Sequence, residues 1–211
     1  MNIDDNLKRR GLMVILSSPS GAGKTTICKK LIKIMKNINL SISYTTRQKR
    51  TNERHGKDYY FIRNNEFNNL KKKNFFIETA KVFNHYYGSP YENITKSFKQ
   101  NKSILFDIDW QGAKKLRKKY PKDIIIDFFI LPPSKKELRK RLDKRGRDNK
   151  KEIKMRLSLA ISEISHHNDY KYVIINDKLN DTINNIRDII KYNQLESNLS
   201  NKVKQNLQRE K

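Results

Sequence analysis

The sequence is poor in the features that would build a crosslinked or membrane-embedded protein. It contains a single cysteine, Cys28, in 211 residues, which excludes an internal disulfide and fits a reducing compartment. No stretch approaches the ~18 consecutive apolar residues of a membrane span. Charges among the first ten residues leave no room for the apolar region of a secretory signal. We therefore expect a cytoplasmic protein without membrane association.

Acidic residues are also scarce. The chain has 22 Asp and Glu against 47 Lys and Arg, a formal net charge of +25. Such a charge raises nucleic acid or an anionic membrane surface as a partner. The basic residues are spread along the whole chain, however, and a bias towards Lys, Asn and Ile can place cations on a surface without selection for binding. We expect no specific nucleic-acid partner, since a phosphate-handling enzyme also needs clustered arginines.

Alternating strands and helices fill most of the chain, which is long enough for one α/β unit with a small insertion. Apolar runs bounded by turn residues predict strands, and apolar residues at helical spacing predict helices. This reading gives strands at 12–16, 103–108, 124–131 and 172–175, each followed by a helix. The first helix is expected to end near Asn37 or Asn39. Alternation of this kind predicts a mainly parallel sheet covered by helices.

The pattern changes in the middle and at the end of the chain. Extended segments and a short helix capped by Asn64 predict a small lobe at about 43–100, inserted between core segments 1–42 and 101–193. Beyond Asn193 the sequence becomes polar. We expect 194–211 to form a frayed or weakly helical tail.

The segment SPSGAGKT lies at residues 18–25, between a predicted buried strand and a helix. It matches the P-loop pattern from its Gly-Lys-Thr end, although Ser18 replaces the first glycine. In such a loop backbone N–H groups converge on phosphate oxygens, Lys24 reaches the β- and γ-phosphates, and Thr25 ligates Mg²⁺. The alternative is a chance glycine turn before an ordinary helix. The predicted ATP-binding residues here are Ser20, Gly21, Ala22, Gly23, Lys24, Thr25 and Thr26.

Further short motifs follow the loop in order: TTRQKR at 45–50, Glu53, GKDYYF at 56–61, FIE at 76–78, YYGS at 86–89 and DIDWQG at 107–112. Together with the P-loop they resemble the guanylate kinase family over about residues 11–193, with Trp110 closer to the bacterial form. The resemblance implies a nucleoside monophosphate kinase fold with a P-loop core, a GMP-binding lobe at 43–100 and a lid at about 134–160. It also implies transfer of the γ-phosphate of ATP to GMP and dGMP, with Mg²⁺, in purine metabolism.

The resemblance implies a phosphate site for GMP. Arg47 and Arg50 match a pair of phosphate-binding arginines, of which Arg47 is also a candidate catalytic residue; their guanidinium groups can grip a phosphate with charge-assisted bonds. Tyr59 and Tyr87 match tyrosines that donate hydroxyl hydrogens to the same phosphate. Taken alone, such arginines could form a solvated basic face, and such tyrosines are more often core residues with a wet tip.

The resemblance also implies a guanine site. Glu78 matches a carboxylate that accepts from guanine N1–H and N2–H, a donor pair that adenine lacks; an exposed surface Glu is the alternative. Ser43 and Ser89 match hydroxyls that contact the base, although Ser89 before Pro90 is also a helix N-cap signature. Asp109 matches a position near GMP, and Asp107, on the same side of one strand, matches one near the water shell of the metal.

The lid and the ATP side complete the predicted site. Arg145 and Arg156 match a pair of transition-state arginines, and Arg141 lies in the same lid segment. Taken alone, arginines on a basic helix usually form a solvated face. Asn176 matches a position near the adenine of ATP.

Two other classes of protein compete with this interpretation. An interaction module that has lost catalysis would have a damaged P-loop or damaged GMP ligands, and both sets are intact here. A P-loop kinase for another nucleotide, or a nucleic-acid-stimulated ATPase, is the second alternative. The sequence leaves a homo-oligomer open.

Overall fold

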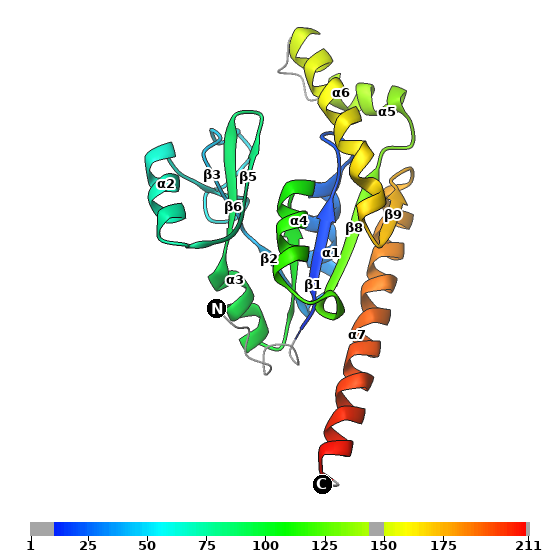
Figure 1. Cartoon of the computed structure of the whole chain (residues 1–211). Coiled ribbons are helices and arrows are strands. Elements are labelled where there is room, and N and C mark those ends of the chain that lie inside the picture. The colour runs from blue at the N-terminus through cyan, green and yellow to red at the C-terminus, as the bar shows by residue number, and fades with distance from the viewer. Residues whose placement is uncertain (1–10, 144–149, 210–211) are drawn as a thin grey trace.

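A five-stranded parallel sheet forms the centre of the molecule (Figure 1). The computed structural model describes residues 11–143 and 150–209. The strand order is β2-β7-β1-β8-β9. The strands span Ile38–Ser41 (β2), Ser103–Asp107 (β7), Met13–Ser17 (β1), Ile125–Leu131 (β8) and Tyr172–Ile175 (β9). The predicted α/β class with a mainly parallel sheet is confirmed.

Side chains alternate along β1 and so bind helices to both faces of the sheet. Val14 and Leu16 join one apolar cluster, beneath α1 (Lys24–Ile34) and α7 (Leu179–Arg209). Met13 and Ile15 join the other, beneath α3 (Tyr91–Lys99) and α4 (Trp110–Lys119). A strand buried on both faces is therefore wholly apolar, which is why the run at 12–16 predicted it.

A second sheet lies beside the first, with the strand order β4-β3-β6-β5. It contains β3 (Tyr44–Thr45), β4 (Tyr60–Phe61), β5 (Phe76–Val82) and β6 (His85–Pro90). Helix α2 (Asn64–Lys72) buries Phe67 against it, with the ring stacked on those of Phe76 and Tyr86 at 4.7 and 5.5 Å between centroids. From here on we call residues 43–90 the small lobe, a shorter range than the expected 43–100, because α3 packs on the central sheet through Ile94 and Phe98.

Two helices stand above the carboxyl ends of the central strands (Figure 1). They are α5 (Lys135–Asp143) and α6 (Lys150–Ile164), which pack through Leu138, Leu142 and Ala160. Ser134 accepts from the backbone N–H of Glu137 at 3.1 Å, which is one of the two hydrogen bonds of a capping box. Short 3₁₀ turns, η1 (Lys122–Ile124) and η2 (Ser165–Asp169), precede β8 and β9.

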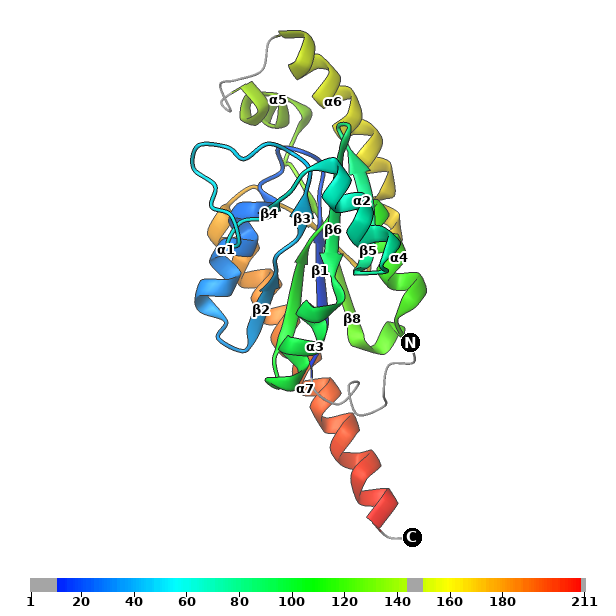
Figure 2. The same cartoon turned by 90° about the vertical axis from the view of Figure 1, so that its left-hand side faces the viewer.

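Two local predictions were wrong. Helix α1 ends at Ile34, and Asn39 lies in β2, where its amide donates to Ser97 Oγ and Gln100 Oε1. Asn64 is the first residue of α2 and not its cap; the cap position is Arg63, without a side-chain capping bond. Of the two alternatives expected for the tail, frayed or weakly helical, the structure has a helix, since α7 continues to Arg209 and projects beyond the sheet (Figure 2).

The physical reason for the long α7 is that helix formation is costly to start and cheap to extend. Ile183, Ile186 and Ile190 dock the first half of α7 on the core, and no Gly or Pro interrupts the chain as far as Arg209. Among the helices that the structure describes, none is long and apolar enough to cross a membrane.

Candidate functional site

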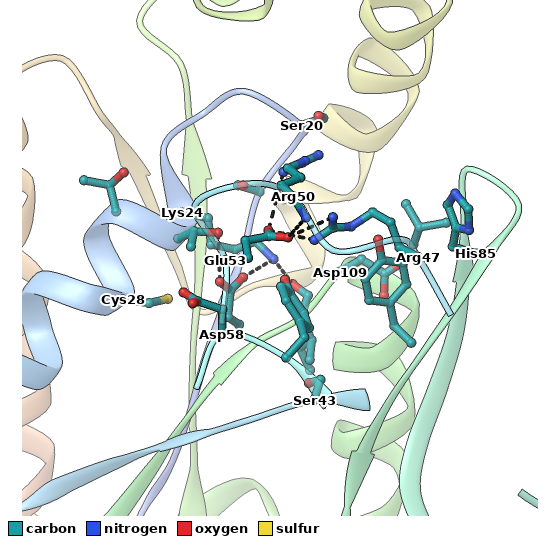
Figure 3. Close-up of a pocket in the computed structure, with 18 of the residues that line it drawn as sticks. Ser20, Lys24, Cys28, Ser43, Arg47, Arg50, Glu53, Asp58, His85 and Asp109 are labelled. Atoms are coloured by element: carbon teal, nitrogen blue, oxygen red, sulfur yellow. Dashed lines mark hydrogen bonds and ion pairs between the residues drawn. The ribbon is translucent and has the colours of Figure 1, made fainter. Parts of the chain in front are cut away.

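A cavity of about 850 Å³ opens between the loop after β1, the small lobe and α6 (Figure 3). Most of the predicted site residues line it. They are Ser20, Gly21, Gly23, Lys24, Thr25, Thr26, Ser43, Arg47, Arg50, Tyr59, Glu78, Tyr87, Asp107, Asp109 and Arg156. Ala22, Ser89, Arg141 and Asn176 are not among the lining residues, and Arg145 lies outside the described residues.

The glycines of the loop are required by its backbone and by its neighbours. Gly21 and Gly23 have φ angles of 95° and 99°, which side-chain-bearing residues rarely adopt. A Cβ on Gly23 would also stand 2.6 Å from the side-chain nitrogen of Asn176. That amide donates to the carbonyl of Ala22 at 2.8 Å, so the segment after β9 holds the loop in place.

Arg141 also contacts this segment. Its Nη2 donates to the carbonyl of Asn176 at 3.2 Å, while its Nε donates to Glu137 Oε1 at 3.0 Å. The structure thus places Arg141 and Asn176 behind the loop and in contact with each other.

Lys24 is paired with Asp107 at the end of β7. Its Nζ lies 2.6 Å from Asp107 Oδ1 and donates to the carbonyl of Ile108 at 2.9 Å. Thr25 donates to the other Asp107 oxygen at 3.0 Å. Burial lowers the pKa of Lys24, but the charge of Asp107, the neighbouring Tyr59 and the hydrogen bond to Asp107 together outweigh burial, so the pKa lies above its usual value. The ammonium is therefore fully charged at neutral pH.

Arg47 is held by a bidentate ion pair with Glu53. Its two terminal nitrogens donate to the two carboxylate oxygens at 2.8 and 3.0 Å, and the backbone N–H of Arg50 donates to the same carboxylate at 2.9 Å (Figure 3). The guanidinium carbon also lies 5.5 Å from the ring centroid of Tyr59. Glu53 therefore brings both predicted phosphate-binding arginines to one wall of the cavity.

The tyrosines lie beside these arginines. The rings of Tyr59 and Tyr87 meet edge to face, 6.0 Å apart. Burial raises the pKa of Tyr59, so its hydroxyl stays protonated and can donate a hydrogen bond.

Glu78 is a buried carboxylate on β5, with 4% of its surface exposed. Its Oε1 accepts from the backbone N–H and the hydroxyl of Ser89, at 3.1 and 2.7 Å, and Ser43 Oγ lies 3.1 Å from Ser89 Oγ. Burial raises the pKa of Glu78, the Ser89 hydroxyl lowers it and the charge of Asp109 raises it, to about 7. Its second oxygen is 2.7 Å from where a Cβ on Gly112 would stand.

These contacts bear on the two predicted roles of Ser89, a contact with the base and a cap of the following helix. Pro90 occupies the cap position of α3, and no side chain caps that helix. Ser89 therefore does not serve as a cap, and its hydroxyl faces Glu78 and Ser43. Asp109, in contrast, is the cap of α4, accepting from the backbone N–H of Gly112 at 2.9 Å.

Two acidic residues were missed as site residues. Glu53 was noted only as part of a motif, without a role. Glu163 of α6 was not singled out, yet it lines the cavity and its Oε2 accepts from the backbone N–H of Ser20 at 3.0 Å. Burial raises the pKa of Glu163, although the Ser20 N–H opposes the shift. The one signal in the sequence was its spacing of seven residues from Arg156, which puts both on one helix face.

The oxygen donors at the loop fit a small hard cation. Thr25 Oγ1 and the Asp107 carboxylate stand together, and Mg²⁺ prefers oxygen ligands and binds few protein groups beside phosphates and water. Within the described ranges, no group of three or more His, Cys, Asp or Glu could hold a metal ion by itself. The side chain of His166, a residue type that often binds metals, stacks on the ring of Trp110, with ring centroids 3.6 Å apart.

Comparison with known proteins gives a consistent result. A family model described as guanylate kinase matches residues 10–193. The guanylate kinase of Rickettsia prowazekii is 48% identical over 183 residues, covering 87% of this chain and 92% of the relative. That of Caldanaerobacter subterraneus is 44% identical over 185 residues, covering 88% and 89%. The crystal structure of guanylate kinase from Anaplasma phagocytophilum superposes with a TM-score of 0.74 at 38% identity, covering 90% of this chain and 89% of that one.

Proposed function

The chain belongs to the guanylate kinase family, and from this membership we propose that it transfers the γ-phosphate of ATP to GMP, giving ADP and GDP. The observation that carries the proposal is a single cavity that contains both a phosphate loop and a buried carboxylate. The loop binds a nucleoside triphosphate through its N–H groups and Lys24. Glu78 can accept from the two adjacent N–H groups of guanine, a pair that adenine does not offer.

The GMP phosphate is assigned to Arg47, Arg50, Tyr59 and Tyr87, which supply hydrogen-bond donors on one wall of the cavity. Because a GMP phosphate oxygen is already an anion, the transfer needs no general base. Ser43, Ser89 and Asp109 are assigned to the guanosine side, on the support of their contacts with or near Glu78.

The transferring phosphoryl group is assigned to Lys24, Arg145 and Arg156. Charge spreads over its oxygens in the transition state, and fixed cations stabilise that charge. Arg141 and Asn176 would shape the ATP side from behind the loop. Thr25 would hold Mg²⁺ directly and Asp107 through water; when bound, the ion neutralises phosphate charge. The lid would cover the site and exclude water.

A coupled assay of ADP production tests the proposal. The purified protein, with ATP and Mg²⁺, should turn over GMP and dGMP and should leave AMP, UMP and dTMP almost untouched. Equal turnover of AMP would overturn the guanine assignment. Omitting Mg²⁺ and adding excess EDTA should stop the reaction. We propose a cytoplasmic enzyme without a specific nucleic-acid partner, so added DNA or RNA should not stimulate the reaction.

Lys24→Ala tests the phosphate loop in the same assay. It should remove most turnover while leaving the fold intact, because the ammonium acts on phosphate charge. Lys33→Ala, an exposed lysine on the same helix, is the matched control and should behave like the parent.

A further inference from the structure

Helix α6 carries two charged side chains into the cavity, Arg156 and Glu163. They are seven residues apart, which is two helical turns, so both project from one face of a rigid element about 10 Å apart along its axis. Fixing the direction of Glu163 therefore restricts the direction of Arg156.

The end of α6 that carries Glu163 is fixed to the core. Its carboxylate accepts from the N–H of Ser20, a contact between residues 143 positions apart. Just beyond it, His166 lies flat on Trp110 at the start of α4, at an interplanar angle of 11°.

The packing between α5 and α6 adds a second connection to the loop. Ala160 is buried against Leu138 and Leu142, and those leucines lie 3.0 and 3.2 Å from where a Cβ on Gly21 would stand. The carboxyl-terminal half of α6 is thus joined to the phosphate loop by the Glu163–Ser20 hydrogen bond and, by way of the α5 leucines, by apolar packing.

Arg156 lies nearer the other end of the helix and faces the small lobe. Its guanidinium carbon is 5.4 Å from the ring centroid of Phe83, at the tip of the β5–β6 hairpin. Phe83 has a φ of 47°, uncommon for a bulky residue, so the hairpin holds this ring in place at some cost in backbone energy.

We propose that Glu163 is a positioning residue, which anchors α6 to the phosphate loop through the Ser20 N–H and so sets the direction in which Arg156 enters the cavity. The inference rests on the proposed function, because that function assigns Arg156 to the transferring phosphate. Glu163 needs no contact with either nucleotide in this role. The role requires an acceptor oxygen within hydrogen-bonding distance of the Ser20 N–H.

Three substitutions distinguish the position of the acceptor oxygen at residue 163 from the charge of the side chain. Glu163→Gln keeps an acceptor at the same distance without the charge, and its kcat should stay within about twofold of the parent. Glu163→Asp keeps the charge but withdraws the oxygen by one methylene, and Glu163→Ala removes it. Both should lower kcat about tenfold, with the KM for GMP changed less than about threefold. Glu196→Ala, the same change at an exposed position of α7, is the control.

A double-mutant cycle tests whether Glu163 acts through Arg156. In an Arg156→Ala background, Glu163→Ala should cost less than about twofold in kcat. Full additivity of the two substitutions would overturn the proposal. A kcat equal to that of the parent in folded Glu163→Ala and Glu163→Asp would also overturn it. So would a lower kcat in Glu163→Gln together with an unchanged kcat in Glu163→Asp. A lower KM for ATP with raised kcat in Glu163→Ala would also overturn it, since the carboxylate would then act by repelling phosphate. If the parent itself fails to phosphorylate GMP, the proposed function fails instead.

Discussion

Glu78 combines almost complete burial with contacts that stabilise its charge only in part. Its pKa of about 7 means that protonated and ionised forms coexist at neutral pH. Guanine N1–H and N2–H are donors, so in the proposed site the ionised form is the one that would accept from the base. Base recognition should therefore depend on pH, beside the effect of the second ionisation of the GMP phosphate, whose pKa is about 6.

We expect the affinity for GMP to rise as the pH increases from 6 to 8, because this range spans the pKa of Glu78. Glu78→Gln should flatten that dependence and lower kcat/KM for GMP by about two orders of magnitude, roughly 2.7 kcal/mol. Calorimetric titration with GMP at several pH values measures the first effect and steady-state kinetics the second. A variant that still discriminates GMP from AMP as well as the parent would move guanine recognition to Ser89 and Asp109.

The same pKa gives a stability prediction of known sign. The folded protein binds this proton more tightly than the unfolded chain, where the pKa is near 4.5. The contribution is therefore fully present below about pH 4.5 and is lost as the pH rises through about 7. Between pH 5 and 8, urea unfolding should show a smaller decline in the free energy of unfolding for Glu78→Gln than for the parent.

Gly112 tests the guanine pocket without removing a polar group. It lies inside α4, where Ala would favour the helix by up to ~1 kcal/mol. A Cβ there would stand 2.7 Å from Glu78 Oε2, so the carboxylate must shift. We expect Gly112→Ala to raise the KM for GMP about tenfold and to leave the KM for ATP unchanged. Lys114→Ala, exposed on the same helix, should change neither constant.

The sequence was informative about residues whose chemistry is local and silent about those whose role comes from packing. Gly23, Lys24 and Thr25 could be assigned because the loop is contiguous and each group has one chemical task. Glu163 could not, because its partner Ser20 is 143 residues away and their meeting depends on where α6 lies.

At the scale of elements, α6 contacts the small lobe through Arg156 and the phosphate loop through Glu163. We expect Arg156→Ala to lower kcat by about a hundredfold and to raise the KM for GMP far less, because a cation that acts on the transferring phosphate contributes mainly in the transition state. Arg139→Ala, exposed on α5, is the matched control and should leave kcat unchanged. Equal loss in GMP binding would instead assign Arg156 to the acceptor site.

The two errors at this scale concern asparagines whose local preference predicted a helix boundary. Asn39 predicts a helix end by its local preference, yet β7 pairs with residues 38–41 and makes them a strand. Asn64 has a good capping side chain, but the chain enters α2 one residue earlier. At Asn39, tertiary pairing overrides the intrinsic preference of a single residue; at Asn64, the prediction missed the start of the helix by one residue, a common uncertainty at helix ends.

At the scale of the whole molecule, the second half of α7 extends beyond the core. Tyr192, Leu195 and Leu199 are each more than 60% exposed there. Gln194 is different, since its amide donates to Ser103 Oγ at 2.9 Å and its Oε1 accepts from Asn37 at 3.0 Å.

Deleting residues after Asn193 should leave kcat and both KM values unchanged, because the lining residues of the cavity all precede it. The free energy of unfolding should fall by about 1 kcal/mol through loss of the Gln194 contacts. Gln194→Ala in the full chain should reproduce that loss. A truncated protein that folds but no longer turns over GMP would contradict this reading.

The stacking of Trp110 on His166 has a practical consequence for observing this protein. Trp110 is the sole tryptophan of the chain, and its ring lies 3.6 Å from that of His166. Intrinsic fluorescence excited at the indole band therefore comes from one known position, where the start of α4 meets η2. This turn directly follows α6, and we call the junction the base of α6. Any movement that separates the two rings changes the surroundings of that single fluorophore. The native protein thus contains its own optical reporter for motion at the base of α6, readable by stopped flow without an attached dye.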